Sequence, residues 1–119
     1  MATHNDLGKK GEKLAVQFLL KNNYEILERN FRYRKAEVDI IAREADTLIA
    51  VEVKSRSSVY FGNPEDFVKP AQIKLLVEAI NHYSEKQNTN LEIRFDIIAI
   101  TKSGSNYDIE HITDAFLHF

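Results

Sequence analysis

The sequence contains no cysteine, which excludes disulfide bonds and metal sites built on thiolates. It has no run approaching the roughly 20 apolar residues of a membrane-spanning helix, and its polar start, MATHNDLGKKGEK, is unlike a secretory signal. Glycine and proline are scarce, and no glycine-rich loop of the kind that holds nucleotide phosphates occurs. We therefore expect a cytoplasmic protein that does not enter a membrane and does not act on nucleoside triphosphates.

The composition is that of one folded domain. A chain of 119 residues can bury a core but is too short for two, so residues 1–119 are expected to form a single domain. The net charge of -2 argues against nucleic-acid binding through overall charge. However, the first 35 residues carry eight basic and four acidic side chains, which leaves a charge of -6 for the rest. A basic patch beside an acidic pocket would suit a polyanion held over a metal site, although ordinary solvated surface gives the same count.

The hydrophobic pattern predicts an α/β domain, in which helices cover a mixed sheet. A first helix is expected from a cap at Asp6 to about Asn22, with Glu12 on its apolar face. A second helix is expected to begin at Pro70. A turn is expected at residues 63–66. The expected strands are residues 24–33, 37–43, 48–55, 91–101 and, as a short edge strand, 107–112.

Two carboxylates are expected to meet in the hairpin formed by the second and third strands. If its turn is centred between Ala45 and Asp46, Asp39 faces Glu52 with Cβ atoms about 5 Å apart, and Lys54 lies on the same face. The flanking residues are apolar on both sides, as in interior strands. Two such carboxylates repel each other unless a proton or a cation lies between them, and Mg²⁺ prefers oxygen ligands. The alternative is a solvated ladder of ion pairs on an exposed face.

Glu12 is a candidate for a third carboxylate of this site. It shares a helix face with Ala15, Val16 and Leu19, where a charged side chain is costly without a partner. The alternative is a position at the edge of that face in the first turn, where the helix dipole favours an acid.

The spacing of these residues carries a family resemblance. Asp39, followed by twelve residues and then Glu52-Val53-Lys54, resembles the D-(x)n-E-x-K core of the PD-(D/E)xK nuclease superfamily, which has the restriction-endonuclease-like fold. From about residue 8 to residue 100 the chain resembles the bacterial YraN family of predicted endonuclease-like proteins. The resemblance implies a three-layer α/β/α fold with a mixed sheet of four to five strands. The blocks that carry it are GEKLAVQFLLKNNYEILERNFR, AEVDIIARE, LIAVEVKSRS, FGNPEDFV and RFDIIAI.

The resemblance also implies roles for individual residues. It makes Asp39 and Glu52 ligands of Mg²⁺ or Mn²⁺ and Lys54 the catalytic lysine of phosphodiester hydrolysis. Glu12 matches the helix glutamate that the related Holliday-junction resolvases add to the site, and those resolvases imply a homodimer.

Two further positions support the site. Glu37 falls on the glutamate of the family's G-E-[IV]-D, preceded here by Ala36 where glycine is common. Gln72 stands where the family usually has lysine, at the start of the second helix.

The expected partner is DNA, branched or otherwise structured. Phe31 and Tyr33, interleaved with the basic residues, would stack on bases or belong to the core. Two alternatives remain: a nucleic-acid-binding or repair-scaffold protein that does not cleave, and a protein-interaction module whose carboxylates are structural. The four histidines lack ligand spacing and are expected to be surface or packing residues. The basic residues expected to contact the DNA backbone are Arg29, Arg32, Arg34, Lys35 and Arg56.

Overall fold

The computed structural model describes residues 4–57 and 68–116, which form two helices and five strands. The turn expected at residues 63–66, together with most of the FGNPEDFV block, lies outside these residues. The elements in chain order are α1 (His4–Lys21), β1 (Glu25–Tyr33), β2 (Ala36–Glu44), β3 (Thr47–Arg56), α2 (Pro70–Lys86), β4 (Glu92–Ser103) and β5 (Asn106–Ile112).

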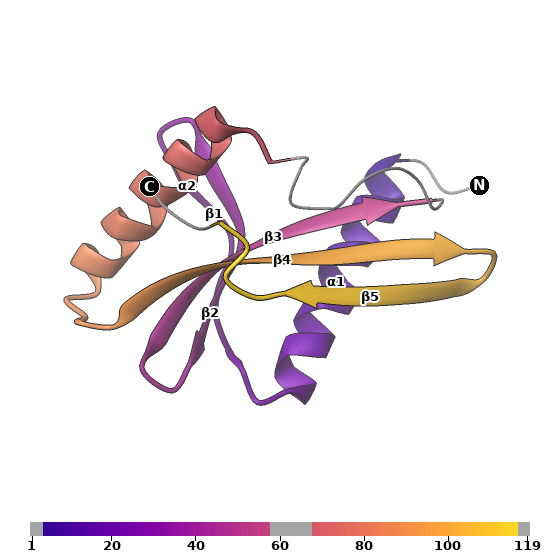
Figure 1. Ribbon diagram of the computed structural model, residues 1–119, viewed down its shortest axis with the longest axis horizontal. Helices are drawn as coiled ribbons and strands as arrows, with labels where there is room; N and C mark the ends of the chain where they lie inside the picture. Colours follow the sequence, from indigo (N-terminus) through magenta and orange to yellow (C-terminus); the bar gives the residue numbers. More distant parts are fainter. Residues whose placement is uncertain (1–3, 58–67, 117–119) are drawn as a thin grey trace.

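The strands form one mixed sheet in the order β1-β2-β3-β4-β5. Neighbouring strands are antiparallel except β3 and β4, which run parallel and lie on either side of α2 in the chain. A parallel pair needs such a crossover, since a tight turn cannot join it. Helix α1 covers one face of the sheet and α2 covers the other (Figure 1). The predicted fold class, a three-layer α/β/α domain with a mixed sheet, is therefore confirmed.

Each helix buries one face in a separate hydrophobic cluster. Helix α1 buries Ala15 and Leu19 against residues of β2, β3 and β4. Helix α2 buries Leu76, Ala79 and Ile80 against the other face of the sheet. These side chains recur every three or four residues, which is the pattern that predicted both helices. Neither helix of the described chain combines the length and apolar character that crossing a bilayer requires.

The start of α1 differs from the prediction. The helix begins at His4, and Asp6 lies inside its first turn instead of capping it. A carboxylate is still favourable there because the N-terminal end of a helix carries partial positive charge. One turn farther on, α1 lies so close to the sheet that a Cβ atom at Gly11 would collide with the Ser55 side chain. Glycine at this position therefore permits the close packing of α1 on β3.

The β2–β3 hairpin has the register predicted from the sequence. Its pairs run from Glu44 with Thr47 at the turn to Ile40 with Val51, so the turn is centred between residues 45 and 46. A slip of one residue would have sent one strand's side chains to the opposite face. The ladder therefore ends directly before Asp39 and Glu52, the two carboxylates that are expected from the sequence to meet.

Candidate active site

Asp39 lies where the pairing of β2 with β3 ends. The ladder stops one residue short of it, and the backbone N–H of Val53 donates a hydrogen bond of 2.8 Å to Asp39 Oδ2. The alternation of β2 also shifts in this stretch. Val38 and Ile41 are three residues apart, yet both belong to the cluster beneath α2, whereas a regular strand would direct them to opposite faces. The irregularity lets a side chain, Asp39, satisfy a backbone donor of the neighbouring strand.

Glu52 is almost completely buried, with 8% of its surface exposed, and its two carboxylate oxygens have different surroundings. Oε1 accepts a hydrogen bond from Gln72 Nε2 (3.1 Å) and lies 3.6 Å from Lys54 Nζ. Oε2 is buried and has no hydrogen-bond partner among the described residues. A buried acceptor without a partner is unfavourable. Glu52 therefore keeps one strong acceptor for an added donor or cation.

Both carboxylates are harder to ionise than a solvated acid. Burial, reinforced by repulsion from Glu52, raises the pKa of Asp39 to about 7, although the hydrogen bond from Val53 acts in the opposite direction. Burial also raises the pKa of Glu52, against the lowering effects of Lys54 and of the hydrogen bond from Gln72. Near neutral pH such a pair either retains a proton or requires an added positive charge.

The two carboxylates line one cavity between the sheet and α2, with a volume of about 250 Å³. Mg²⁺ commonly binds proteins through one or two carboxylates while keeping several of its waters, and Mn²⁺ accepts the same oxygen ligands. The two acids, their raised pKa values and the unpartnered Oε2 of Glu52 therefore fit either cation. The residues that line this cavity are Lys35, Ala36, Glu37, Asp39, Glu52, Gln72, Leu75 and Leu76.

Two further glutamates act on the site through their charges. Glu37 lines the cavity and forms an ion pair with Arg32 (3.0 Å). Glu12 is half-buried on α1. After burial and Glu52, the charges of Glu12 and Glu37 also raise the pKa of Asp39. Within residues 4–57 and 68–116, however, no three His, Asp or Glu side chains are gathered so that they could hold a metal. The role of Glu12 as a third ligand therefore stays a prediction.

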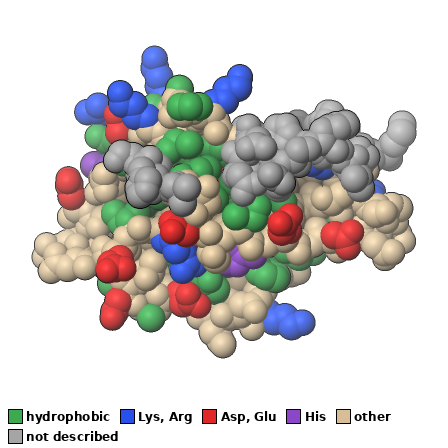
Figure 2. Space-filling model, in the orientation of Figure 1, with side chains coloured by type: hydrophobic (Ala, Val, Ile, Leu, Met, Phe, Trp, Pro, Cys, Tyr) green, Lys and Arg blue, Asp and Glu red, His purple; other side chains and the backbone are tan. Residues whose placement is uncertain are grey.

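The basic residues predicted to contact DNA are divided among three places. Arg29 and Arg32 are exposed on β1, while Arg34 and Lys35 form the two-residue turn between β1 and β2. Lys35 lines the cavity, whereas Arg56 is the last residue of β3 and does not. In Figure 2, Lys and Arg side chains gather along the upper edge of the molecule, where Figure 1 places the β1–β2 turn and α2. Of these five basic residues, Lys35 of the turn is the one that lines the cavity of the carboxylates.

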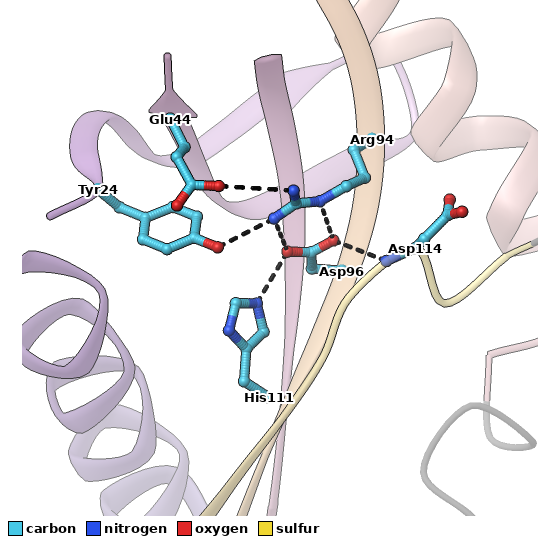
Figure 3. Close-up of polar contacts among 6 residues, drawn as sticks. All are labelled: Tyr24, Glu44, Arg94, Asp96, His111 and Asp114. Carbon is cyan, nitrogen blue, oxygen red and sulfur yellow. Dashed lines mark hydrogen bonds and ion pairs between the residues drawn. The ribbon is translucent and has the colours of Figure 1, made fainter. Parts of the chain in front are cut away.

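A second buried acid, Asp96 of β4, was not predicted as part of any site (Figure 3). It is completely buried. Arg94 donates two hydrogen bonds to its carboxylate, from Nε to Oδ1 (2.9 Å) and from Nη2 to Oδ2 (2.8 Å). His111 Nε2 donates to Oδ2 (2.8 Å), and the backbone N–H of Asp114 donates to Oδ1 (3.0 Å). Both oxygens of Asp96 are therefore saturated by the protein itself.

The surroundings of Asp96 favour its ionised form. Burial alone would raise its pKa, but the hydrogen bonds from the three donors lower the pKa below its usual range. Arg94 is held in turn by the hydroxyl of Tyr24 (3.0 Å) and by an ion pair with Glu44 (3.7 Å). The arrangement ties β4 to β2, to β5 and to the segments that follow α1 and β5. It is a structural ion-pair network.

Part of this network corresponds to a recognisable sequence pattern. In RFDIIAI an acid interrupts an apolar strand, and Arg94 precedes Asp96 by two residues, so both side chains lie on one face. That pattern indicates a buried ion pair. The contact of Asp96 with His111 joins residues fifteen positions apart and has no local pattern. His111 does pack as expected, edge-on against the rings of Phe18 and Tyr24.

Comparison with known proteins identifies the family. The chain is 62% identical to a UPF0102 protein of Christiangramia forsetii over the full length of both chains. It is 58% identical to a UPF0102 protein of Flavobacterium psychrophilum, again over the whole of both chains. A UPF0102 protein of Geobacter metallireducens is 44% identical over 98% of this chain and 97% of its own. The model of the uncharacterised protein family UPF0102 matches residues 11–100. The chain therefore belongs to family UPF0102, the YraN family that its sequence blocks resemble.

Proposed function

We propose that this protein binds Mg²⁺ or Mn²⁺ at Asp39 and Glu52 and hydrolyses phosphodiester bonds in DNA, including branched or otherwise structured DNA. The observation that carries the proposal is the pair of carboxylates in one cavity. The pKa of Asp39 is raised to about 7, and Glu52 Oε2 is buried without a hydrogen-bond partner among residues 4–57 and 68–116. Acids with strongly perturbed pKa values in a cavity are typical of functional sites. Among the described residues, Glu52 Oε2 lacks the internal donor that a purely structural role would supply.

Each side chain of the site has a distinct task in this proposal. Mg²⁺, when bound, polarises a phosphoryl oxygen and lowers the pKa of a water molecule so that it can attack near neutral pH. Asp39 and Glu52 hold the cation through their carboxylates. Gln72 fixes the orientation of Glu52 through the hydrogen bond to Oε1. The Lys54 ammonium, 3.6 Å from the same oxygen, stabilises the negative charge that develops on the phosphate.

The β1–β2 turn supports a polyanionic substrate. Lys35 lines the cavity of the carboxylates and Arg34 precedes it in the turn, so a phosphate backbone would meet positive charge beside the carboxylates. This local charge offsets the net charge of -2 of the whole chain. DNA binding would depend strongly on salt, because such contacts release counterions.

The alternative is a nucleic-acid-binding or repair-scaffold protein that keeps the fold without cleaving. One observation favours it: Gln72 places a neutral amide on Glu52 at the start of α2, so the helix adds no positive charge beside the carboxylates at that point. The two functions differ in whether Lys54 matters for a chemical step.

Replacing Lys54 separates these functions. We expect Lys54→Ala to lower the single-turnover cleavage rate roughly a hundredfold to a thousandfold, the usual cost of losing one preorganised electrostatic contact. Binding of Mg²⁺ and DNA should be retained, since neither depends mainly on this ammonium. Lys54→Arg should rescue the rate only in part, because a planar guanidinium cannot place a compact charge at the same point. Single-stranded, duplex and branched DNA should be compared at one salt concentration in Mg²⁺ and in Mn²⁺.

The matched control is Lys86→Ala, which removes an exposed lysine from the last turn of α2. It should leave the cleavage rate unchanged. A wild type that binds DNA yet cleaves no substrate above the Lys54→Ala background in either metal would contradict the nuclease and favour the scaffold.

A further inference from the structure

A second cavity lies between the end of the β1–β2 hairpin and α2. Its volume is about 340 Å³. The rings of Tyr33 and His82 are stacked in it, with centroids 4.0 Å apart and planes 17° apart. The guanidinium of Arg34 lies over the Tyr33 ring, 5.2 Å from its centroid. The cavity thus contains a stacked aromatic pair with a cation over one of its rings. Its lining residues are Tyr33, Arg34, Glu78, Asn81, His82 and Glu85.

This cavity adjoins the candidate active site. Arg34 lines it, and the next residue, Lys35, lines the cavity of the two carboxylates. On α2, Leu75 lines the carboxylate cavity and Glu78 lines the second one, which is a separation of about one helical turn. The β1–β2 turn therefore presents one cation to each cavity. A strand crossing the turn would pass from the carboxylates to the stacked aromatic pair.

We propose that the second cavity binds one unpaired nucleobase of the DNA strand whose backbone crosses the β1–β2 turn. This inference rests on the proposed function and narrows its substrate class. Proteins commonly hold unpaired bases by stacking them on aromatic side chains, whatever the base, and an arginine near the ring strengthens the contact. A base inside a duplex is already stacked and paired, so only a fork, a flap or a single-stranded end offers one at low cost.

The charges around the cavity orient such a nucleotide. Arg34 and Lys35 attract the phosphates toward the turn. On the opposite side, Glu78 and Glu85 are exposed on α2. Carboxylates repel phosphates but accept hydrogen bonds from the exocyclic amino groups of bases. The base is therefore directed toward α2 and the backbone toward the turn.

The test compares two DNA substrates of equal length, one forked and one blunt-ended, in metal-free buffer at a single salt concentration. Wild-type protein should bind the forked DNA more tightly. Tyr33→Leu and His82→Ala should each weaken forked-DNA binding roughly fivefold to a hundredfold, the range for one lost base–aromatic stack, and should leave blunt-DNA binding unchanged. A 2-aminopurine base placed in the unpaired arm should lose fluorescence by stacking when the wild type binds. This quenching should be absent in both variants.

The matched control is Tyr107→Leu, which removes a half-buried tyrosine beside Lys10 and Lys102 on the edge strand β5. It should keep the preference for forked DNA. Equal affinity of the wild type for both substrates would overturn the inference and leave the proposed nuclease standing. Equal weakening of both substrates in the Tyr33 and His82 variants would make the ring pair structural and also overturn it. A wild type that binds neither DNA would overturn the inference and the proposed function together.

Discussion

Two buried acidic sites lie on opposite faces of one sheet, and the fold treats their negative charge differently. Asp96 accepts hydrogen bonds at both oxygens, including those from Arg94 and His111, and its pKa is lowered. Asp39 accepts a hydrogen bond from the backbone N–H of Val53, Glu52 Oε2 has no partner among the described residues, and the pKa of each acid is raised. The chain can therefore neutralise a buried carboxylate completely. At Asp39 and Glu52 the fold leaves the negative charge incompletely neutralised, which suits an external cation.

Alanine substitutions at the two sites should have very different effects on stability. Asp96→Ala leaves Arg94, which is only 22% exposed at its side chain, and His111 without their buried partner. Breaking a buried ion pair in this way costs about 3–5 kcal/mol. Asp39→Ala should cost far less, and it can stabilise the metal-free protein by removing repulsion with Glu52. Urea unfolding in metal-free buffer at pH 7 measures both. Equal losses of unfolding free energy in the two variants would contradict this difference between the two sites.

The two sites should also make the free energy of unfolding change with pH in opposite directions. The folded-state pKa of Asp39 is raised from 3.8 to about 7. The stabilising contribution of Asp39 to the free energy of unfolding is therefore fully present below about pH 4 and is lost as the pH rises to about 7. A difference of one bound proton corresponds to about 1.4 kcal/mol per pH unit. The folded-state pKa of Asp96 is lowered, so its contribution is present above about pH 4 and is lost as the pH falls below it.

Unfolding free energies measured from pH 3 to pH 8 separate these contributions. Asp39→Asn should flatten the decline between pH 4 and pH 7, while Asp96→Asn should alter the acidic limb below pH 4. A full decline that persists in Asp39→Asn would assign it to a different group.

The parts of the fold that were predictable are those with local causes. The register of the β2–β3 hairpin followed from its turn and from the apolar residues that flank Asp39 and Glu52. The helix faces followed from three- and four-residue spacing. The short edge strand expected at residues 107–112 is β5, which follows a turn where Gly104 has a positive φ of 63°. In each case neighbours in the sequence determine the geometry.

The finer details of the site could not be predicted because they depend on distant residues. The hydrogen bond from Val53 to Asp39 joins two strands where their ladder ends, and the one from Gln72 to Glu52 spans twenty residues. The family resemblance identified Gln72 only as a departure from lysine. Its contact with Glu52 depends on how α2 packs on the sheet. The saturation of Asp96 likewise requires β5 to lie beside β4.

The measurement that tests the central claim most directly is a Mg²⁺ titration followed by unfolding at pH 8, where Asp39 is ionised. At a Mg²⁺ concentration ten times the dissociation constant, the wild type should gain about 1.4 kcal/mol of stability. Asp39→Asn and Glu52→Gln should lose this gain. Asp46→Asn, which removes an exposed acid from the turn of the same hairpin, should keep it. A gain that survives in both site variants would show that the cation binds elsewhere, and no gain in the wild type would contradict the site altogether.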